Sequence, residues 1–223
     1  MTLQNRVAPD GSLHAVGERG MFTGNRGILH DPVTRTLKGR RWTTKAWICC
    51  ALDYRDTRRD VWGLNANTRQ GRSVGWSELF FMDEVTALAA GHRPCFLCRR
   101  EAAQSFVSAM GVASAPQCDQ ILHGERQLSA RDKPGNTGTE PIETLPDGTV
   151  VEIDNQFHAI RGGHALPWSF GGYGQPEPLA LLRHRLAKSF SGFAASIVTP
   201  PSTLKALRAG YSPAWHPAAI IAQ

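Results

Sequence analysis

Four of the five cysteines stand as two close pairs, and this arrangement constrains the fold more than any other feature of the sequence. Cys95 and Cys98 form a C-x-x-C motif, whereas Cys49 and Cys50 are adjacent in a short apolar run. Two cysteines separated by two residues place their sulfurs on one side of a tight turn, as in half of a tetrahedral zinc site. An odd cysteine count argues against a disulfide framework, and a redox dithiol would need a βαβ setting that is not visible. We therefore expect one structural Zn²⁺ held by Cys49, Cys50, Cys95 and Cys98.

Short, irregularly alternating strand and helix signals predict an α+β fold, a single compact domain built around the zinc-binding module. Asp83 is a suitable N-cap for a helix that Gly91 would end. Residues 164–178 are rich in Gly, Pro and aromatic residues, which indicates a loop. We expect strands at 45–53, 78–81, 145–153, 157–160 and 196–199, and helices at 84–90, 99–110, 117–128, 179–190 and 202–209. The expected organisation is a basic, zinc-containing and DNA-facing region (1–128), a linker (129–141), and an α+β region (142–223) packed on the first.

The charge distribution indicates a polyanion-binding surface. The chain has 25 basic and 19 acidic residues, and residues 1–100 hold 16 of the basic and 9 of the acidic ones. Most of the basic residues are arginine, whose planar fork suits phosphate and base edges. Tryptophans interleaved with them could stack on unpaired bases, although Trp47 reads as core. We expect DNA as partner, contacted by Arg26, Arg40, Arg41, Arg58, Arg59, Arg99 and Arg100; the alternative is a merely soluble basic protein.

Two groups of residues are candidates for catalysis. In the stretch from Gly24 onward, His30 offers a proton shuttle and Asp31 a carboxylate, which is what hydrolysis of an N-glycosidic bond requires. The alternative is a turn in which Asp31 caps the backbone before a proline. Asp119 and His123 are four residues apart on a predicted helix and share one face, so they could form an acid–base set or a solvated surface.

Two segments resemble a known family. Residues 79–100 (LFFMDEVTALAAGHRPCFLCRR) resemble the zinc-binding half of Ada-type DNA repair proteins, and residues 43–50 (TTKAWICC) look like that family's strand with its first zinc cysteine. The resemblance implies a zinc tetrathiolate in a small α/β module that tracks along a DNA backbone. It also implies that a strand thiolate accepts a methyl group from an alkylated phosphate.

The resemblance extends to individual ligand positions. Cys95 and Cys98 match the family's C-terminal ligand pair, and Cys49 or Cys50 matches the strand cysteine. The family's second cysteine would fall near Asp53, so the fourth ligand could be the other adjacent cysteine, Asp53 or a histidine from elsewhere. Adjacent cysteines on a strand point to opposite faces, so both can bind one ion only if the strand is twisted or bulged.

Together these features predict a zinc-containing protein that processes modified or damaged DNA. Hydrolytic release of an altered base, as by a DNA glycosylase, is the first expectation. The alternatives are alkyl transfer to Cys49 or Cys50, a metal nuclease using His30, and a non-catalytic zinc-stabilised DNA-binding module. The N-terminus lacks a basic region followed by an apolar one, and no apolar stretch approaches the length of a membrane span, so we expect a cytoplasmic protein.

Overall fold

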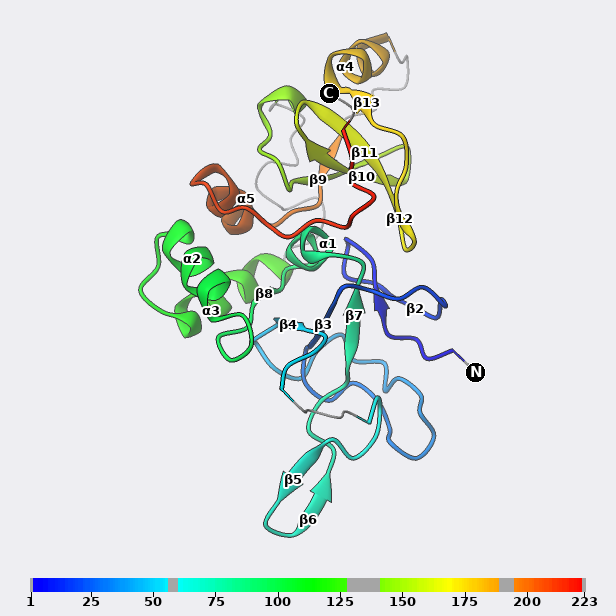
Figure 1. Ribbon diagram of the computed structural model, residues 1–223, viewed down its shortest axis with the longest axis vertical. Helices are drawn as coiled ribbons and strands as arrows, with labels where there is room; N and C mark the ends of the chain where they lie inside the picture. Colours follow the sequence, from blue (N-terminus) through cyan, green and yellow to red (C-terminus); the bar gives the residue numbers. More distant parts are fainter. Residues whose placement is uncertain (1, 56–59, 128–140, 189–194, 222–223) are drawn as a thin grey trace.

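Two β-sheets with a helix between them form the body of the protein (Figure 1). The computed structural model describes residues 2–55, 60–127, 141–188 and 195–221. Both helices and strands are present throughout, so the expected α+β class is confirmed. Among the described residues, no helix is both long enough and apolar enough to cross a bilayer.

The first sheet is mixed, with the order β2-β1-β7-β3-β4-β8. Its strands are β1 (Arg6–Val7), β2 (Leu13–His14), β3 (Phe22–Asn25), β4 (Ile48–Ala51), β7 (Leu79–Phe81) and β8 (Arg93–Pro94). β3 is antiparallel to both neighbours, whereas β8 runs parallel to β4. Strands β5 (Ala66–Thr68) and β6 (Gly71–Ser73) form a separate hairpin. β4, which carries the adjacent cysteines, lies next to the edge strand β8.

The second sheet is antiparallel, with the order β12-β11-β10-β9-β14 and β13 beside β11. Its strands are β9 (Val150–Ile153), β10 (Gln156–Arg161), β11 (His164–Ser169), β12 (Gly172–Tyr173), β13 (Glu177–Pro178) and β14 (Ser196–Ile197). The expected hairpin is confirmed, because β9 and β10 pair across Asp154 and Asn155, which both have positive φ. The expected loop at 164–178 is wrong over much of its length, since β11, β12 and β13 lie there and its aromatic residues face the core.

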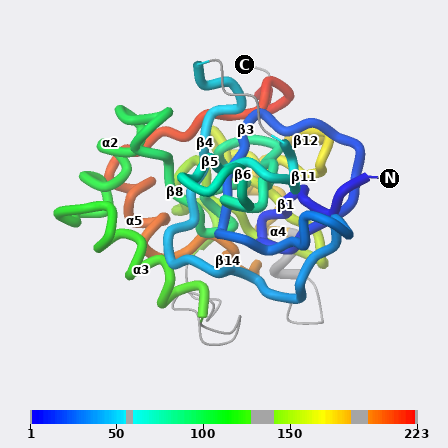
Figure 2. Tube along the Cα trace, turned by 90° about the horizontal axis from the view of Figure 1, so that it is seen from below, coloured from blue at the N-terminus to red at the C-terminus, as the bar shows by residue number. Residues whose placement is uncertain are grey.

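The helices follow their sequence signals. They are α1 (Glu84–Ala89), α2 (Arg100–Met110), α3 (Ala115–Gln127), α4 (Leu179–Lys188) and α5 (Pro201–Arg208), with a 3₁₀ turn, η1, at Ile142–Thr144. The Asp83 carboxylate accepts a hydrogen bond of 2.8 Å from the Thr86 N–H, as its N-cap position predicts. Gly111, in the left-handed region, ends α2. Helices α2, α3 and α5 lie together on one side of the first sheet (Figure 2).

Helix α1 is buried on every side, and it joins the two sheets. Val85 and Ala89 pack with residues of the second sheet, Leu88 packs among α2, α3 and α5, and Ala87 belongs to the core of the first sheet. Every residue of α1 is buried, including the polar Glu84 and Thr86, so the helix belongs to the interior. The cluster around α1 thus contains residues from both 1–128 and 142–223; most of the expected linker lies outside the described residues.

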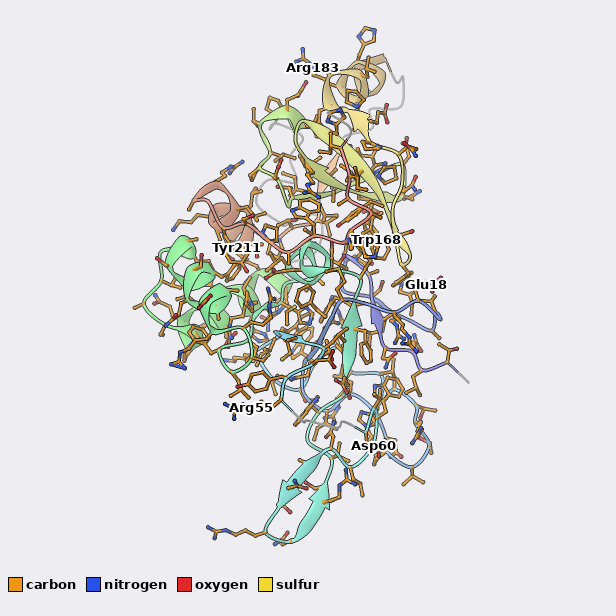
Figure 3. All side chains as sticks on the ribbon, in the orientation of Figure 1. Glu18, Arg55, Asp60, Trp168, Arg183 and Tyr211 are labelled. Atoms are coloured by element: carbon orange, nitrogen blue, oxygen red, sulfur yellow. The ribbon has the colours of Figure 1, made fainter. Side chains whose placement is uncertain are left out.

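Two consecutive carboxylates at the start of α1 bind the C-terminal part of the chain. Asp83 accepts hydrogen bonds from the Tyr173 hydroxyl (2.8 Å) and from the His216 N–H (3.2 Å). Glu84 accepts from the Tyr211 hydroxyl at 2.6 Å. Figure 3 shows Tyr211 and Trp168 between the two sheets, on either side of α1. Buried carboxylates are tolerated because each oxygen has a donor.

Candidate metal centre

Three cysteine sulfurs meet at one edge of the first sheet. Cys50 comes from β4, and Cys95 and Cys98 come from the turn between β8 and α2. Their Sγ atoms all lie within 4.8 Å of one another. In a tetrahedral zinc–thiolate site, bonds of about 2.3 Å put the sulfurs about 3.8 Å apart. The cluster could therefore hold a metal ion with little rearrangement.

Strand pairing brings the three residues together. β8 runs parallel to β4 with Cys49 opposite Pro94, so Cys95 follows at the position beside Cys50. The Cys95 N–H donates to the Cys49 carbonyl at 2.9 Å, which extends this pairing by one step. The chain then turns, and the Arg99 N–H donates back to the Cys95 carbonyl at 2.9 Å. This turn places Cys98 directly before α2, as the C-x-x-C spacing predicts.

Backbone donors and neighbouring thiols favour negative charge on the cluster. The Leu97 N–H points at the Cys95 sulfur and the Ala51 N–H at the Cys98 sulfur, each at 3.4 Å. Hydrogen bonds from Cys50 and then Cys98 hold the pKa of Cys95 far below its usual range. Bonding to Cys95 and Cys98, followed by burial, raises the pKa of Cys50. Binding of a metal ion by the three residues would displace any thiol protons that remain.

Cys49 is not part of the cluster, so the predicted set of four cysteines is corrected to three. Successive side chains on a strand point to opposite faces, and β4 has no bulge that would overcome this. Cys49 is fully buried in the core formed with Leu79 and Phe81. Burial raises the pKa of its thiol. Asp53, the other candidate ligand on this segment, is exposed and does not join the group.

A cavity of about 240 Å³ lies against the cluster. The described residues that line it are Thr23, Gly24, Asn25, Ile48, Cys50, Tyr54, Trp76, Cys95, Leu97 and Cys98. No histidine or carboxylate is among them, so the fourth coordination position of a bound ion would face the cavity. Catalytic zinc sites combine three protein ligands with one open position, whereas structural sites are closed by four.

The other residues that line the cavity include aromatic and polar groups that the sequence motifs did not identify. Tyr54 and Trp76 lie on either side of residues 55–75, which contain five arginines. Thr23 is the cross-strand partner of Cys50. Thr23 Oγ1 lies 2.9 Å from a carboxylate oxygen of the buried Glu78. The only available signal was the tryptophan in polar surroundings, because cross-strand pairing is not visible in sequence.

His30 is a buried packing residue that does not line the cavity. Its Nδ1 lies 2.5 Å from Ser77 Oγ, and its ring stacks on Trp62 with centroids 5.3 Å apart. Ser77 Oγ already accepts hydrogen bonds from the N–H groups of Leu29 and His30, so its hydroxyl donates to Nδ1 and Nε2 carries the proton. Burial lowers the pKa of His30, which keeps the ring neutral.

The remaining candidate catalytic groups also have structural partners. Asp31 accepts hydrogen bonds from the N–H groups of Thr34 and Val33, which lower its pKa and fix a turn. Asp119 is buried and holds Arg93 through two hydrogen bonds of 2.7 and 2.8 Å. His123 lies 2.8 Å from the side chain of Gln127 and meets the edge of Trp42. None of these groups lines the cavity.

The predicted DNA-contacting arginines divide into exposed and buried ones. Arg40, Arg41 and Arg100 are exposed, whereas Arg58 and Arg59 lie outside the described residues. Arg26 is 1% exposed and donates to the Gly11 carbonyl and to His92 Nε2, so the prediction that Arg26 faces DNA is wrong. This bond also occupies His92, which is therefore not a metal ligand.

Arg99 is largely buried and connects the cysteine turn to α1. It donates to Glu84 Oε2 at 2.6 Å and to the Cys49 sulfur at 3.5 Å. Its guanidinium also lies 4.4 Å from the ring centroid of Phe22. With a side chain only 11% exposed, Arg99 connects the cysteine turn to α1, so the prediction that Arg99 faces DNA is wrong.

Comparison with known proteins gives no match: no protein-family model, no curated protein and no solved structure corresponds to this chain. The resemblance to the Ada-type zinc module therefore stays a prediction. The arguments about function rest on the cluster and its cavity.

Proposed function

We propose that the protein is a zinc-dependent DNA-processing protein in which Cys50, Cys95 and Cys98 hold the ion and the adjacent cavity receives a modified group of the DNA. One observation carries this proposal: three sulfurs lie within 4.8 Å of one another at the wall of a cavity whose described lining residues include no histidine or carboxylate. The expected tetrathiolate would have been closed by four protein ligands. A three-cysteine site leaves a position for a ligand from outside.

The donor set fits zinc. Soft thiolates select Zn²⁺ or Cu(I) over magnesium and calcium, and the sulfurs are already close enough for tetrahedral bonding. A bound zinc ion would supply charge stabilisation that keeps the three thiols deprotonated at neutral pH. The backbone N–H groups of Leu97 and Ala51 orient two of these sulfurs.

The cavity fits a small, partly flat group. Trp76, Tyr54 and Ile48 give it apolar walls, while Thr23 and Asn25 provide hydrogen-bonding groups. The exposed Arg40, Arg41 and Arg100 support a polyanionic partner.

Alkyl transfer to Cys50 is the reaction that this geometry supports best. Hydrolytic release of a base needs a carboxylate or imidazole beside the reacting bond, and His30 and Asp31 do not line the cavity. Apart from Tyr54, the titratable groups among the described lining residues are the three thiols. In the proposed step, Cys50 Sγ bonds to the alkyl carbon of an alkylated phosphate as the carbon–oxygen bond breaks. The phosphate oxygen leaves with the electron pair.

Metal analysis of the purified protein is the first test. We expect one zinc per chain in the wild type and loss of that zinc in Cys50→Ser, Cys95→Ser and Cys98→Ser. Cys118→Ser is the matched control, because Cys118 is buried among α2, α3 and α5. Cys49→Ser should also keep zinc. Wild-type protein without bound metal would refute the proposal.

Mass spectrometry after incubation with methylated duplex DNA is the second test. We expect one added methyl group on the peptide that contains Cys49 and Cys50, assigned to Cys50 by fragmentation. Cys49→Ser should still be methylated. Zinc-loaded protein that never gains a methyl group would show that alkyl transfer is wrong and would leave the ion a structural role.

A further inference from the structure

We infer that the β5–β6 hairpin is an arm that enters a groove of duplex DNA next to the metal centre. This inference rests on the proposed function, because it names the element that would position the DNA for the cysteine cavity. The hairpin lies within residues 55–75, a segment that contains five arginines.

The hairpin projects from the body of the protein. Figure 1 shows β5 and β6 at the end of the molecule opposite α4, and Figure 2, viewed from that end, shows them in front of the first sheet. Residues 67–72 are all exposed, and among the described residues neither strand pairs with any strand but the other. Gly71, at φ 111°, and the Thr68 hydroxyl, 2.7 Å from the Gly71 carbonyl, form the tight turn. A lone two-stranded hairpin is marginally stable in water, which favours a partner that supports it.

The exposed surface of the hairpin is cationic and rich in hydrogen-bonding groups. Residues 61–77 contain no aspartate or glutamate. Among the described residues, Arg69 and Arg72 form no ion pair, whereas Arg93 and Arg99 in the body are each paired with a carboxylate. Asn67 and Gln70 carry amides of the kind that read adenine edges. A strip with charge, amides and no large apolar side chain fits a nucleic acid better than a protein partner.

The base of the hairpin is fixed to the wall of the cavity. Asn65 accepts hydrogen bonds from the N–H groups of Gly75 (2.8 Å) and Trp76 (3.3 Å) and donates to the Trp76 carbonyl (2.8 Å). Trp76 lines the cavity together with the three cysteines. The next residue, Ser77, is anchored through its N–H to the Gly27 carbonyl at 2.9 Å. DNA bound along the hairpin would therefore lie beside the opening that leads to Cys50.

The shape of the arm indicates double-stranded DNA. The major groove of B-form DNA, about 12 Å wide, admits a two-stranded β-ribbon. The hairpin has no aromatic side chain of its own between 65 and 73, so it lacks the stacking surface that single-strand binders use. Arg69 and Arg72 would contact phosphates or guanine edges, and the amides would read the groove.

The test is fluorescence anisotropy with a labelled DNA duplex, using the zinc-loaded protein. We expect Arg69→Gln with Arg72→Gln to weaken duplex binding by about 100-fold, at about tenfold for each arginine. The slope of log affinity against log salt should fall by about 1.8 if both contact phosphate. Arg183→Gln is the matched control, because Arg183 is also exposed and lies on α4 at the opposite end (Figure 3). Zinc content should be unchanged in every variant.

Three outcomes would overturn the inference. The first is a double variant that binds the duplex as tightly as the wild type. The second is single-stranded DNA bound more tightly than the duplex through the same arginines. The third is wild-type protein that holds zinc but binds no DNA, which would also remove the DNA partner from the proposed function. Failure of the proposed function alone would look different, namely lost zinc or no methyl adduct in a protein that still binds duplex through Arg69 and Arg72.

Discussion

Removal of one hydroxyl from Tyr211 should measurably destabilise the whole protein. The Tyr211 hydroxyl donates to Glu84 Oε1 at 2.6 Å, and Glu84 is 1% exposed. Burial raises the pKa of Tyr211, so the phenol stays protonated and remains a donor at neutral pH. A hydrogen bond to a buried charged group contributes about 1.5–3 kcal/mol, and water cannot replace the lost donor here. The ring contact with Phe106, at 5.1 Å between centroids, would survive in Tyr211→Phe.

Urea unfolding followed by far-UV circular dichroism measures this effect. We expect Tyr211→Phe to lose about 1.5–3 kcal/mol of unfolding free energy at an unchanged m-value, and to melt about 3–12 °C lower. Tyr173→Phe should show a similar loss, because Tyr173 donates to Asp83. Tyr54→Phe is the control, since Tyr54 lines the cavity and lies outside this network. A Tyr211→Phe protein within 0.5 kcal/mol (about the usual effect of a neutral surface change) of the wild type would refute the argument.

Three further predictions concern charge, ion pairing and packing. Burial raises the pKa of Asp83 above its ordinary 3.8. The carboxyl therefore makes its full contribution to the free energy of unfolding below about pH 4 and loses that contribution as the pH rises through the folded-state pKa. Between pH 4 and 7, the free energy of unfolding of Asp83→Asn should fall less than that of the wild type. Arg93→Met should cost about 3–5 kcal/mol in urea unfolding by leaving Asp119 buried without its partner, and a cost below 1 kcal/mol would show that the pair is dispensable. Gly24→Ala should abolish soluble folded protein, because a Cβ would lie 2.0 Å from the Ile48 carbonyl oxygen, whereas Gly17→Ala, with nothing within 4 Å, should express and melt as the wild type does.

Local signals in the sequence were sufficient for the helix boundaries and the cysteine turn. Asp83 caps α1, Gly111 ends α2, and the C-x-x-C spacing brings Cys95 and Cys98 together because each depends on residues only a few positions apart. The β9–β10 hairpin was predictable for the same reason. The assignment of Cys49 failed because the face to which a strand residue points depends on the register of pairing with β3, which a single sequence does not reveal.

Arginine was the least predictable residue type. A guanidinium suits a DNA phosphate, a buried carboxylate and a backbone carbonyl equally well, and the choice depends on distant parts of the chain. Arg93 meets Asp119 from α3, Arg26 donates to the Gly11 carbonyl, and Arg99 meets Glu84. The arginines of the first half thus lie in the interior as well as on the surface. Only the exposure of each side chain in the structure distinguishes Arg69 and Arg72 from the buried arginines.

The position of Arg99 explains why the cysteine turn belongs to a chain much longer than a zinc-binding module. Arg99 directly follows Cys98, and its partner Glu84 also accepts hydrogen bonds from Tyr211 and from the Ala214 N–H. One carboxylate therefore fixes both the start of α2, which carries the turn, and the segment after α5. A site with only three protein ligands has one fewer bond to hold its geometry than a closed site. In the proposed zinc site, attachment through α1 to the second sheet would supply the missing constraint and leave the fourth position open to the cavity.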